Sequence, residues 1–136
     1  NVRILEWRAS SNGARLAAEH HAYRGLPSGS ITVRRRWELL GEVLTVEDEI
    51  LGSGKHHLEL RFTLPGNLVI EQVSPTQATI GNGGAGGIEF TCDHPFSITE
   101  GWYSPSYGVQ ESAWWLVMSF DTHTPTRLRY LWRALN

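Results

Sequence analysis

The chain has 136 residues, 40% of them hydrophobic, and its 12 Lys and Arg against 14 Asp and Glu give a formal net charge of -2. This length corresponds to one domain whose core needs no disulfide or structural metal, and no run of about 18 apolar residues is present to cross a membrane. The near-neutral charge argues against a nucleic-acid or membrane-surface binder, because such proteins display a net basic face.

Short runs of alternating apolar and polar residues, separated by Gly, Pro, Ser and Asn, occur from end to end of the chain. Their spacing predicts an all-β fold, an antiparallel β-sandwich of about ten short strands with little or no helix, as a single domain over residues 1–136. The predicted strands are Val2–Arg8, Ala14–His21, Ile31–Leu39, Leu44–Leu51, Lys55–Leu64, Leu68–Val73, Gln77–Ile80, Ile88–Cys92, Phe96–Thr99, Ala113–Phe120 and Thr126–Ala134. Residues 127–136 also fit a helical stripe and residues 14–21 are rich in helix formers, but the neighbouring turn signals favour strands in both.

The segment from residue 31 to residue 50 predicts a β-hairpin whose two-residue turn begins at Gly41, since Gly in the first position suits a type II′ turn. The register that follows pairs three arginines with acidic residues: Arg34 with Glu49, Arg36 with Glu47 and, on the apolar face, Arg35 with Asp48. Arg35, Asp48 and Gly41 are therefore predicted structural residues. We expect Asp48→Ala to cost on the order of 3–5 kcal/mol by stranding a buried guanidinium, and Glu49→Ala well under about 1 kcal/mol.

A second turn is expected at Gly52-Ser53-Gly54. Residues 55–64 would then return beside residues 44–50, and three strands would share one inner face. His56, Leu58, Leu60 and Phe62 would lie opposite Ile50, Asp48, Val46 and Leu44.

No metal site and no cofactor are predicted. The glycine-rich run 81–87 contains G-x-G-x-x-G, but a strand and not a helix is expected after it, which excludes a dinucleotide fingerprint. The six histidines include the doublets His20-His21 and His56-His57, and neighbours on a strand point to opposite faces, so each doublet supplies one ligand to any one site. The single Cys92 is expected to be a core residue. Because the chain starts without an initiator Met or a signal peptide, we expect a piece of a longer protein.

Four blocks carry a resemblance to a known family: ARLAAEHHAYRGLP (14–27), VRRRWEL (33–39), LTVEDEILGSGKHHLELRF (44–62) and EGWYSPSYG (100–108). In this order they resemble the C-terminal β-sandwich portion of heparinase II/III-like proteins, which are polysaccharide lyases and their relatives. The resemblance implies an intact protein in which helical and β portions precede this domain. It also implies an acidic polysaccharide as substrate, β-elimination as reaction, and the bacterial periplasm or the cell exterior as location.

His20, His21 and Tyr23 are the candidate catalytic residues. Eliminative cleavage of a uronate needs a group that neutralises the carboxylate, a base for the C5 proton and an acid for the leaving oxygen. The family's histidine-bearing motifs, an H-x-H-A-D-like run and an H-N-T-like run, lie upstream of these blocks and are absent from this sequence. The resemblance therefore implies that the domain alone is inactive and helps to shape the substrate groove.

The candidate substrate-binding residues are Arg24, Arg34, Arg36, Trp102, Tyr103 and Tyr107. Arginine binds carboxylates and sulfates bidentately. The predicted glutamate partners of Arg34 and Arg36 would compete with such a ligand for these two arginines. The aromatic rings of the 100–108 loop stack on pyranose rings or plug the open end of a sandwich. A carbohydrate-binding module and a purely structural domain therefore stay open as alternatives, with neither nucleic acid nor membrane as partner.

Overall fold

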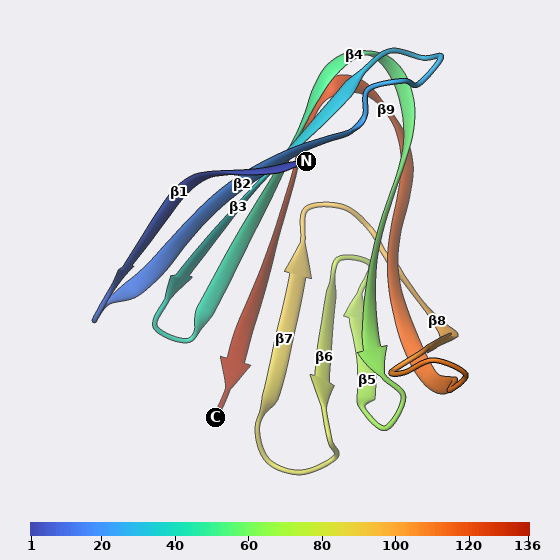
Figure 1. Cartoon of the computed structure of the whole chain (residues 1–136). Helices are drawn as coiled ribbons and strands as arrows, with labels where there is room; N and C mark the ends of the chain where they lie inside the picture. Colours follow the sequence, from blue (N-terminus) through green and yellow to red (C-terminus); the bar gives the residue numbers. More distant parts are fainter.

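The computed structural model describes residues 1–136, and every regular element in it is a strand (Figure 1). All paired strands run antiparallel. No helix is present that could cross a membrane. The strands are β1 (Val2–Ser10), β2 (Gly13–Tyr23), β3 (Ile31–Leu40), β4 (Val43–Pro65), β5 (Val69–Ser74), β6 (Gln77–Gly81), β7 (Gly87–Cys92), β8 (Ser97–Tyr103) and β9 (Glu111–Leu135). The predicted all-β, antiparallel fold class is confirmed.

One continuous sheet makes both layers of the molecule, because two of its strands are long enough to belong to each layer. The strand order is β1-β2-β3-β4-β9-β7-β6-β5, with β8 on β9. β4 and β9 have 23 and 25 residues and pair with each other along almost their whole length. The sheet folds over where these two strands bend (Figure 1), so that their far halves and β8 cover the layer that contains β7 and β6.

The bend has a local cause in the sequence. The β4–β9 register shifts between Ile50 and Gly54, which pair with Thr126 and Thr124, so residues 51–53 of β4 lie opposite Pro125 alone. Proline has no N–H to donate to the ladder, and an unequal number of residues on two paired strands bends the sheet. Gly52 has a φ of 150°, and a Cβ there would lie 2.5 Å from the carbonyl oxygen of Ser30.

The prediction of a third hairpin arm is wrong, because the Gly-Ser-Gly segment forms a bulge in β4. Residues 55–64 do not return beside residues 44–50; β4 continues through the bulge, and Leu58 and Leu60 pair with Phe120 and Met118 of β9. The Gly-Ser-Gly segment supplies a bend and not a reversal. Two pairs of predicted short strands, 44–51 with 55–64 and 113–120 with 126–134, thereby merge into β4 and β9.

The core lies between the two layers and is rich in aromatic rings. Phe62 of β4 makes edge-on contacts with Phe90, Tyr130 and Trp132, with ring centroids 5.1 to 5.8 Å apart. Cys92 is buried in this cluster. The buried members are Val46, Ala78, Ile80, Phe90, Cys92, Phe96, Leu116, Met118 and Tyr130.

The predicted hairpin register is confirmed in full, with Arg34, Arg35 and Arg36 opposite Glu49, Asp48 and Glu47. Gly41 has a φ of 56°, and no residue other than glycine has a positive φ. In a type II′ turn only the first of the two central residues has a positive φ, and Gly41 and Glu42 fit this pattern. The two segments that also fitted a helix are strands, in β2 and β9.

Candidate functional site

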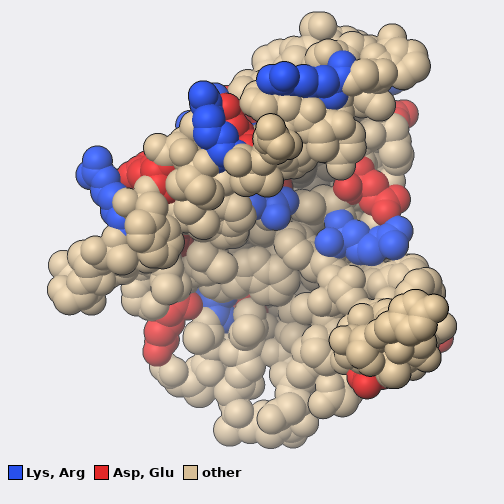
Figure 2. Space-filling model, viewed as in Figure 1, with Lys and Arg blue, Asp and Glu red and all other residues tan.

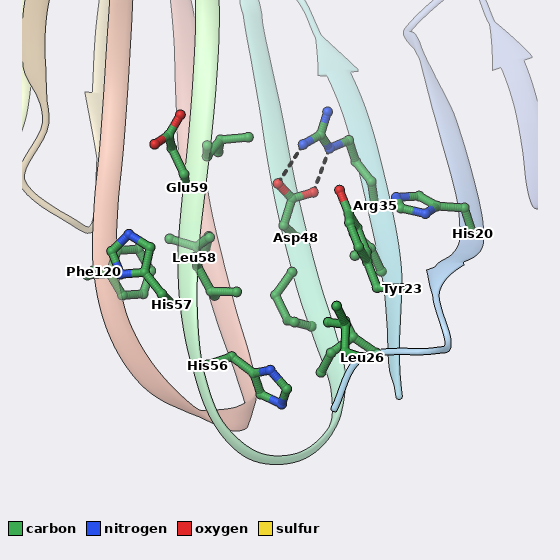
Figure 3. A pocket seen from close by; sticks show the side chains of 15 residues that line it. His20, Tyr23, Leu26, Arg35, Asp48, His56, His57, Leu58, Glu59 and Phe120 are labelled. Atoms are coloured by element: carbon green, nitrogen blue, oxygen red, sulfur yellow. Dashed lines mark hydrogen bonds and ion pairs between the residues drawn. The ribbon is translucent and has the colours of Figure 1, made fainter. Parts of the chain in front are cut away.

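A cavity of about 400 Å³ lies between the inner face of β2 and β3 and the far half of β4, residues 54–65. β4 is the last strand of the covering layer on this side, so the inner face of β2 and β3 remains open beside it. Most of the lining is apolar. The polar residues that line it are His20, Tyr23, Arg35, Asp48, His56, His57 and Glu59 (Figure 3). This cavity is named the Arg35 pocket below.

The Arg35–Asp48 pair forms one end of the pocket. The Nε and Nη2 groups of Arg35 donate hydrogen bonds of 2.5 and 2.7 Å to the two carboxylate oxygens of Asp48. The Tyr130 hydroxyl donates a longer bond of 3.4 Å to the same carboxylate, and burial raises the pKa of this tyrosine. The hydrogen bonds to Asp48 raise the pKa of Arg35 against the opposing effect of burial, so Arg35 stays charged.

Arg35 also has unused hydrogen-bonding capacity. A guanidinium has five N–H groups, and only two of them donate to protein atoms here. No buried polar side-chain atom lacks a partner, and the Arg35 side chain is 31% exposed. The Nη1 atom, which makes no hydrogen bond to the protein, is therefore not buried and is available to solvent or to a ligand.

His20 and Tyr23 lie next to each other at the side of the pocket. Their ring centroids are 5.7 Å apart with the planes tilted by 57°, and both rings line the cavity (Figure 3). Tyr23 is 48% exposed. The β2–β3 register is irregular between these two residues. The structure brings two of the three candidate catalytic residues, His20 and Tyr23, into one cavity.

His56 closes the other end of the pocket and is fully engaged with protein atoms. One ring nitrogen lies 3.1 Å from the Ser28 hydroxyl and the other 2.8 Å from the backbone carbonyl of Ser53. The residue is 7% exposed. His56 therefore fixes the loop between β2 and β3 against the bend of β4 and has no free nitrogen for a ligand.

His21, the third candidate catalytic residue, lies on the opposite face of the sheet. One of its ring nitrogens is 2.8 Å from the Thr32 hydroxyl and the other 3.5 Å from Glu19. The Glu19 carboxylate also binds Arg3 and Arg34, at 2.7 and 3.1 Å. Burial would raise the pKa of Glu19, but the Arg34 hydrogen bond and the charges of Arg3, Arg34 and His21 outweigh burial and lower it.

Two of the arginines predicted to bind substrate belong to the same outer face. Arg34 binds Glu19 more closely than its expected partner Glu49, which is 3.9 Å away. Arg36 contacts Glu47 and Glu49 at 3.3 and 3.2 Å. Figure 2 shows acidic side chains next to basic ones, with no patch of a single sign in that view. These arginines are occupied by glutamates and do not line the Arg35 pocket.

The other predicted substrate-binding residues lie outside the pocket, and all except the half-buried Tyr103 are exposed. Arg24 follows β2 and is exposed. Trp102 is 52% exposed and Tyr107 is fully exposed. Tyr103 donates a hydrogen bond of 2.7 Å to Glu111, which together with burial raises the pKa of Tyr103. Trp102 and Tyr103 belong to β8 and not to the predicted loop, whereas Tyr107 lies between β8 and β9. These aromatic residues form a separate feature from the pocket.

The two adjacent tryptophans of β9 point to opposite sides of the sheet, as neighbours on a strand do. The Trp114 indole N–H donates a 3.2 Å hydrogen bond to the Leu68 carbonyl. The Trp115 ring lies under the Arg61 guanidinium, 4.4 Å from ring centroid to Cζ, and it also lies against Gly101. The face of the Trp115 ring that Arg61 covers is therefore not free to stack on a sugar.

Sequence reasoning did not find a Ser–His–Asp row on the outer face of the second layer. The two ring nitrogens of His57 lie 2.8 Å from the Asp121 carboxylate and 2.9 Å from the Ser119 hydroxyl. The hydrogen bond from His57 lowers the pKa of Asp121 against the effect of burial. His57 and Asp121 are 61% and 63% exposed, so the row lies on an exposed part of the sheet, where His57 also borders the Arg35 pocket.

Sequence reasoning also gave Arg35 a structural role only. The hairpin register, which could be predicted from the sequence, places Arg35 and Asp48 on one face. The opposite wall of the pocket could not be predicted, because it depends on the pairing of residues 54–65 with residues 113–124. No group of three or more His, Cys, Asp and Glu side chains is arranged to hold a metal ion.

The comparisons with known proteins agree with this architecture. The family described as "Heparinase II/III-like, C-terminal" matches residues 3–131. A search of curated proteins found no match. Among solved structures, a heparinase III gene product superposes with a TM-score of 0.73 at 17% identity, over 98% of this chain and 21% of its own. A heparan sulfate lyase HepC mutant from Pedobacter heparinus superposes with a TM-score of 0.76 at 12% identity, over 99% of this chain and 22% of its own.

The chain thus spans about a fifth of the length of the solved structures that it matches, which are 21% and 22% covered. At identities this low, the superpositions show a shared fold only. Membership of the family is shown by the family match over most of the chain. On this evidence the chain belongs to the heparinase II/III-like, C-terminal family.

Proposed function

We propose that this chain is a non-catalytic β-sandwich domain of a lyase that cleaves an acidic polysaccharide by β-elimination. In the intact protein, helical and further β portions would precede the domain and supply the catalytic groups, and the domain would help to shape the groove for the sugar chain. The observation that carries the proposal is the family match over residues 3–131. The names of the matched structures, a heparinase III and a heparan sulfate lyase, agree with it.

The arrangement of the candidate catalytic residues supports inactivity of the domain by itself. Elimination needs a cation or donor, a base and an acid around one sugar unit. His20 and Tyr23 share the Arg35 pocket, but the cation there is neutralised by Asp48. His21 is held by Thr32 and Glu19 on the other face. No uncompensated cation therefore stands beside His20 and Tyr23 to neutralise a uronate carboxylate.

An assay for unsaturated uronate tests the proposal. The purified chain is incubated with alginate, heparan sulfate or hyaluronan, and the ultraviolet absorbance of the unsaturated product is followed. We expect no product from this chain and product from the intact protein on at least one of the polymers. Product from the chain alone would overturn its assignment as non-catalytic, and an intact protein inactive on all acidic polymers would overturn the lyase assignment.

A carbohydrate-binding module is the second candidate, and the exposure of Trp102 and Tyr107 favours it. Rings in such positions stack on pyranose faces without any catalytic group. This reading predicts glycan affinity that falls in Trp102→Ala and Tyr107→Ala while the unfolding midpoint stays constant. Loss of folding in these variants would instead assign the rings to packing.

A further inference from the structure

We propose that the Arg35 pocket binds an uncharged sugar unit of a glycan, by its neighbouring hydroxyls. The choice of a glycan as ligand rests on the proposed function, whereas the preference for an uncharged unit comes from the pocket itself. The pocket would then be a binding subsite for the sugar chain, and the acidic groups of the polymer would be recognised elsewhere.

The Arg35–Asp48 pair offers hydrogen-bond donors to a ligand through its accessible partner, Arg35, which is 31% exposed whereas Asp48 is 3% exposed. Three N–H groups of Arg35 have no protein acceptor. Adjacent hydroxyls of a pyranose, whose oxygens accept hydrogen bonds, match these donors. The bidentate contact between the two side chains keeps both groups in fixed positions.

Charge in the pocket opposes an anionic ligand. The charges of Arg35 and Asp48 cancel, and Glu59 at the edge of the lining is paired with Arg61 at 2.7 Å, so these groups leave no net positive charge to attract an anion. A carboxylate or sulfate that approached Arg35 would also approach the buried carboxylate of Asp48, which is 3% exposed. Like charges in a partly desolvated site repel strongly, so a neutral sugar unit is favoured over a uronate.

The remaining walls suit the apolar faces of a sugar ring. Tyr23 and Phe120 supply aromatic surface, and Leu58 and Leu60 supply aliphatic surface (Figure 3). Aromatic rings pack against the C–H groups of pyranoses while their edges leave the hydroxyls free. The volume of about 400 Å³ lies within the range of small-ligand sites, about 300–1,000 Å³.

The backbone of β4 adds polar groups to the same wall. Past Gly52, β4 pairs with β9 on one side and with no strand on the other. An edge strand presents a row of unpaired N–H and C=O groups, and residues 56–60 of this edge line the pocket. These groups are further partners for sugar hydroxyls and carry no net charge.

The test is a titration of the ¹⁵N-labelled chain followed by NMR amide shifts. Cellotetraose is the neutral probe, and trigalacturonate is the acidic one. We expect cellotetraose to shift the amides of residues 20–35 and 56–60, and trigalacturonate to bind there at least about fivefold more weakly, the equivalent of one unfavourable polar contact. Tighter binding of trigalacturonate in the pocket, or shifts with cellotetraose confined to the β8–β9 loop, would overturn the proposal.

Variants locate the binding without breaking the Arg35–Asp48 pair. Tyr23→Ala and His20→Ala remove exposed or half-buried lining groups and are expected to weaken cellotetraose binding about fivefold each. Arg36→Met, on the outer face, is the matched control and should leave binding unchanged. Cellotetraose binding as tight as that of the wild type in all three variants would contradict the assignment to this pocket.

The outcome is independent of the lyase assay. A pocket that binds no neutral sugar in an intact protein that does release unsaturated uronate would refute this inference alone. A pocket that binds cellotetraose in an intact protein without lyase activity would refute the proposed function alone.

Discussion

Arg35 and Asp48 face each other across the β3–β4 hairpin, and the two partners are buried to very different extents. The Asp48 side chain is 3% exposed, whereas that of Arg35 is 31% exposed and borders an open pocket. The carboxylate therefore depends on the guanidinium for its charge compensation, while the guanidinium has access to water.

This asymmetry predicts unequal effects of breaking the pair. Arg35→Met leaves a buried, uncompensated carboxylate and should lower the free energy of unfolding by about 3–5 kcal/mol. Asp48→Asn leaves a cation that reaches solvent and should cost less, on the order of 1–3 kcal/mol. Urea denaturation measures both. This order departs from the expectation from sequence, which assumed that the guanidinium was buried.

The double variant Arg35→Met/Asp48→Leu is the control, because replacing both partners of a buried pair with apolar residues is often close to neutral. It should be more stable than Arg35→Met alone. A double variant as unstable as the sum of the single ones would show that the two side chains do not act as a pair. Equal losses in the two single variants would contradict the predicted asymmetry.

Glu19 predicts a dependence of stability on pH. Its pKa is lower in the folded chain than the ordinary 4.5, so its contribution to stability is complete above that value. As pH falls from about 5 through the folded pKa, the unfolded state binds the proton first, and the contribution is lost. Glu19→Gln should therefore lose less stability than the wild type between pH 6 and pH 3.

Thermal unfolding midpoints over this range provide the measurement. Glu38→Gln is the matched control, because Glu38 lies on the same outer face and its only ion-pair partner is Arg15. Parallel pH curves for the wild type and Glu19→Gln would mean that the Arg3 and Arg34 contacts do not hold Glu19 ionised.

Cys92 predicts a thiol that is inert in the folded chain. Burial raises the pKa of Cys92 to about 11, and its Sγ atom lies against Met118 in the core. Because the thiolate is the reactive form, Ellman's reagent at pH 8 should label the chain slowly in buffer and completely in urea. Equal rates in the two conditions would place this thiol at the surface.

Gly101 predicts a packing defect on the outer face of the second layer. A methyl group there would overlap the ring of Trp115, which is held between β8 and the Arg61 guanidinium. Gly101→Ala should therefore cost about 1–3 kcal/mol. Gly25→Ala is the control, since nothing lies within 4 Å of its Cβ position; it should change stability by less than about 0.5 kcal/mol. A neutral Gly101→Ala would show that Trp115 moves freely.

The parts of the fold that depend on local patterns were predictable from the sequence. Alternation located the strands, and the glycine at position 41 fixed the hairpin register through the turn type that it favours. The Arg35–Asp48 pair followed from that register, because the side chains of a strand alternate between its faces.

The parts that depend on distant pairing were not predictable. A Gly-Ser-Gly segment is compatible with a reversal and with a bulge, and the choice depends on Pro125, which lies opposite that segment only after β4 and β9 have paired. For the same reason the sequence could not place His56 at the end of the pocket opposite Arg35. His20 and His21 were separated by the rule of alternation, but which of them faced the pocket depended on the layer that covers the sheet.

Cross-strand backbone NOEs test most directly whether β4 continues through the bulge and forms both layers. The paired residues to observe are Leu60 with Met118 and Val46 with Tyr130. The folded-over sheet predicts backbone NOEs within both pairs. Backbone NOEs between Leu60 and Val46 instead would mean that residues 55–64 return as a hairpin arm, and the Arg35 pocket would not exist in the form described.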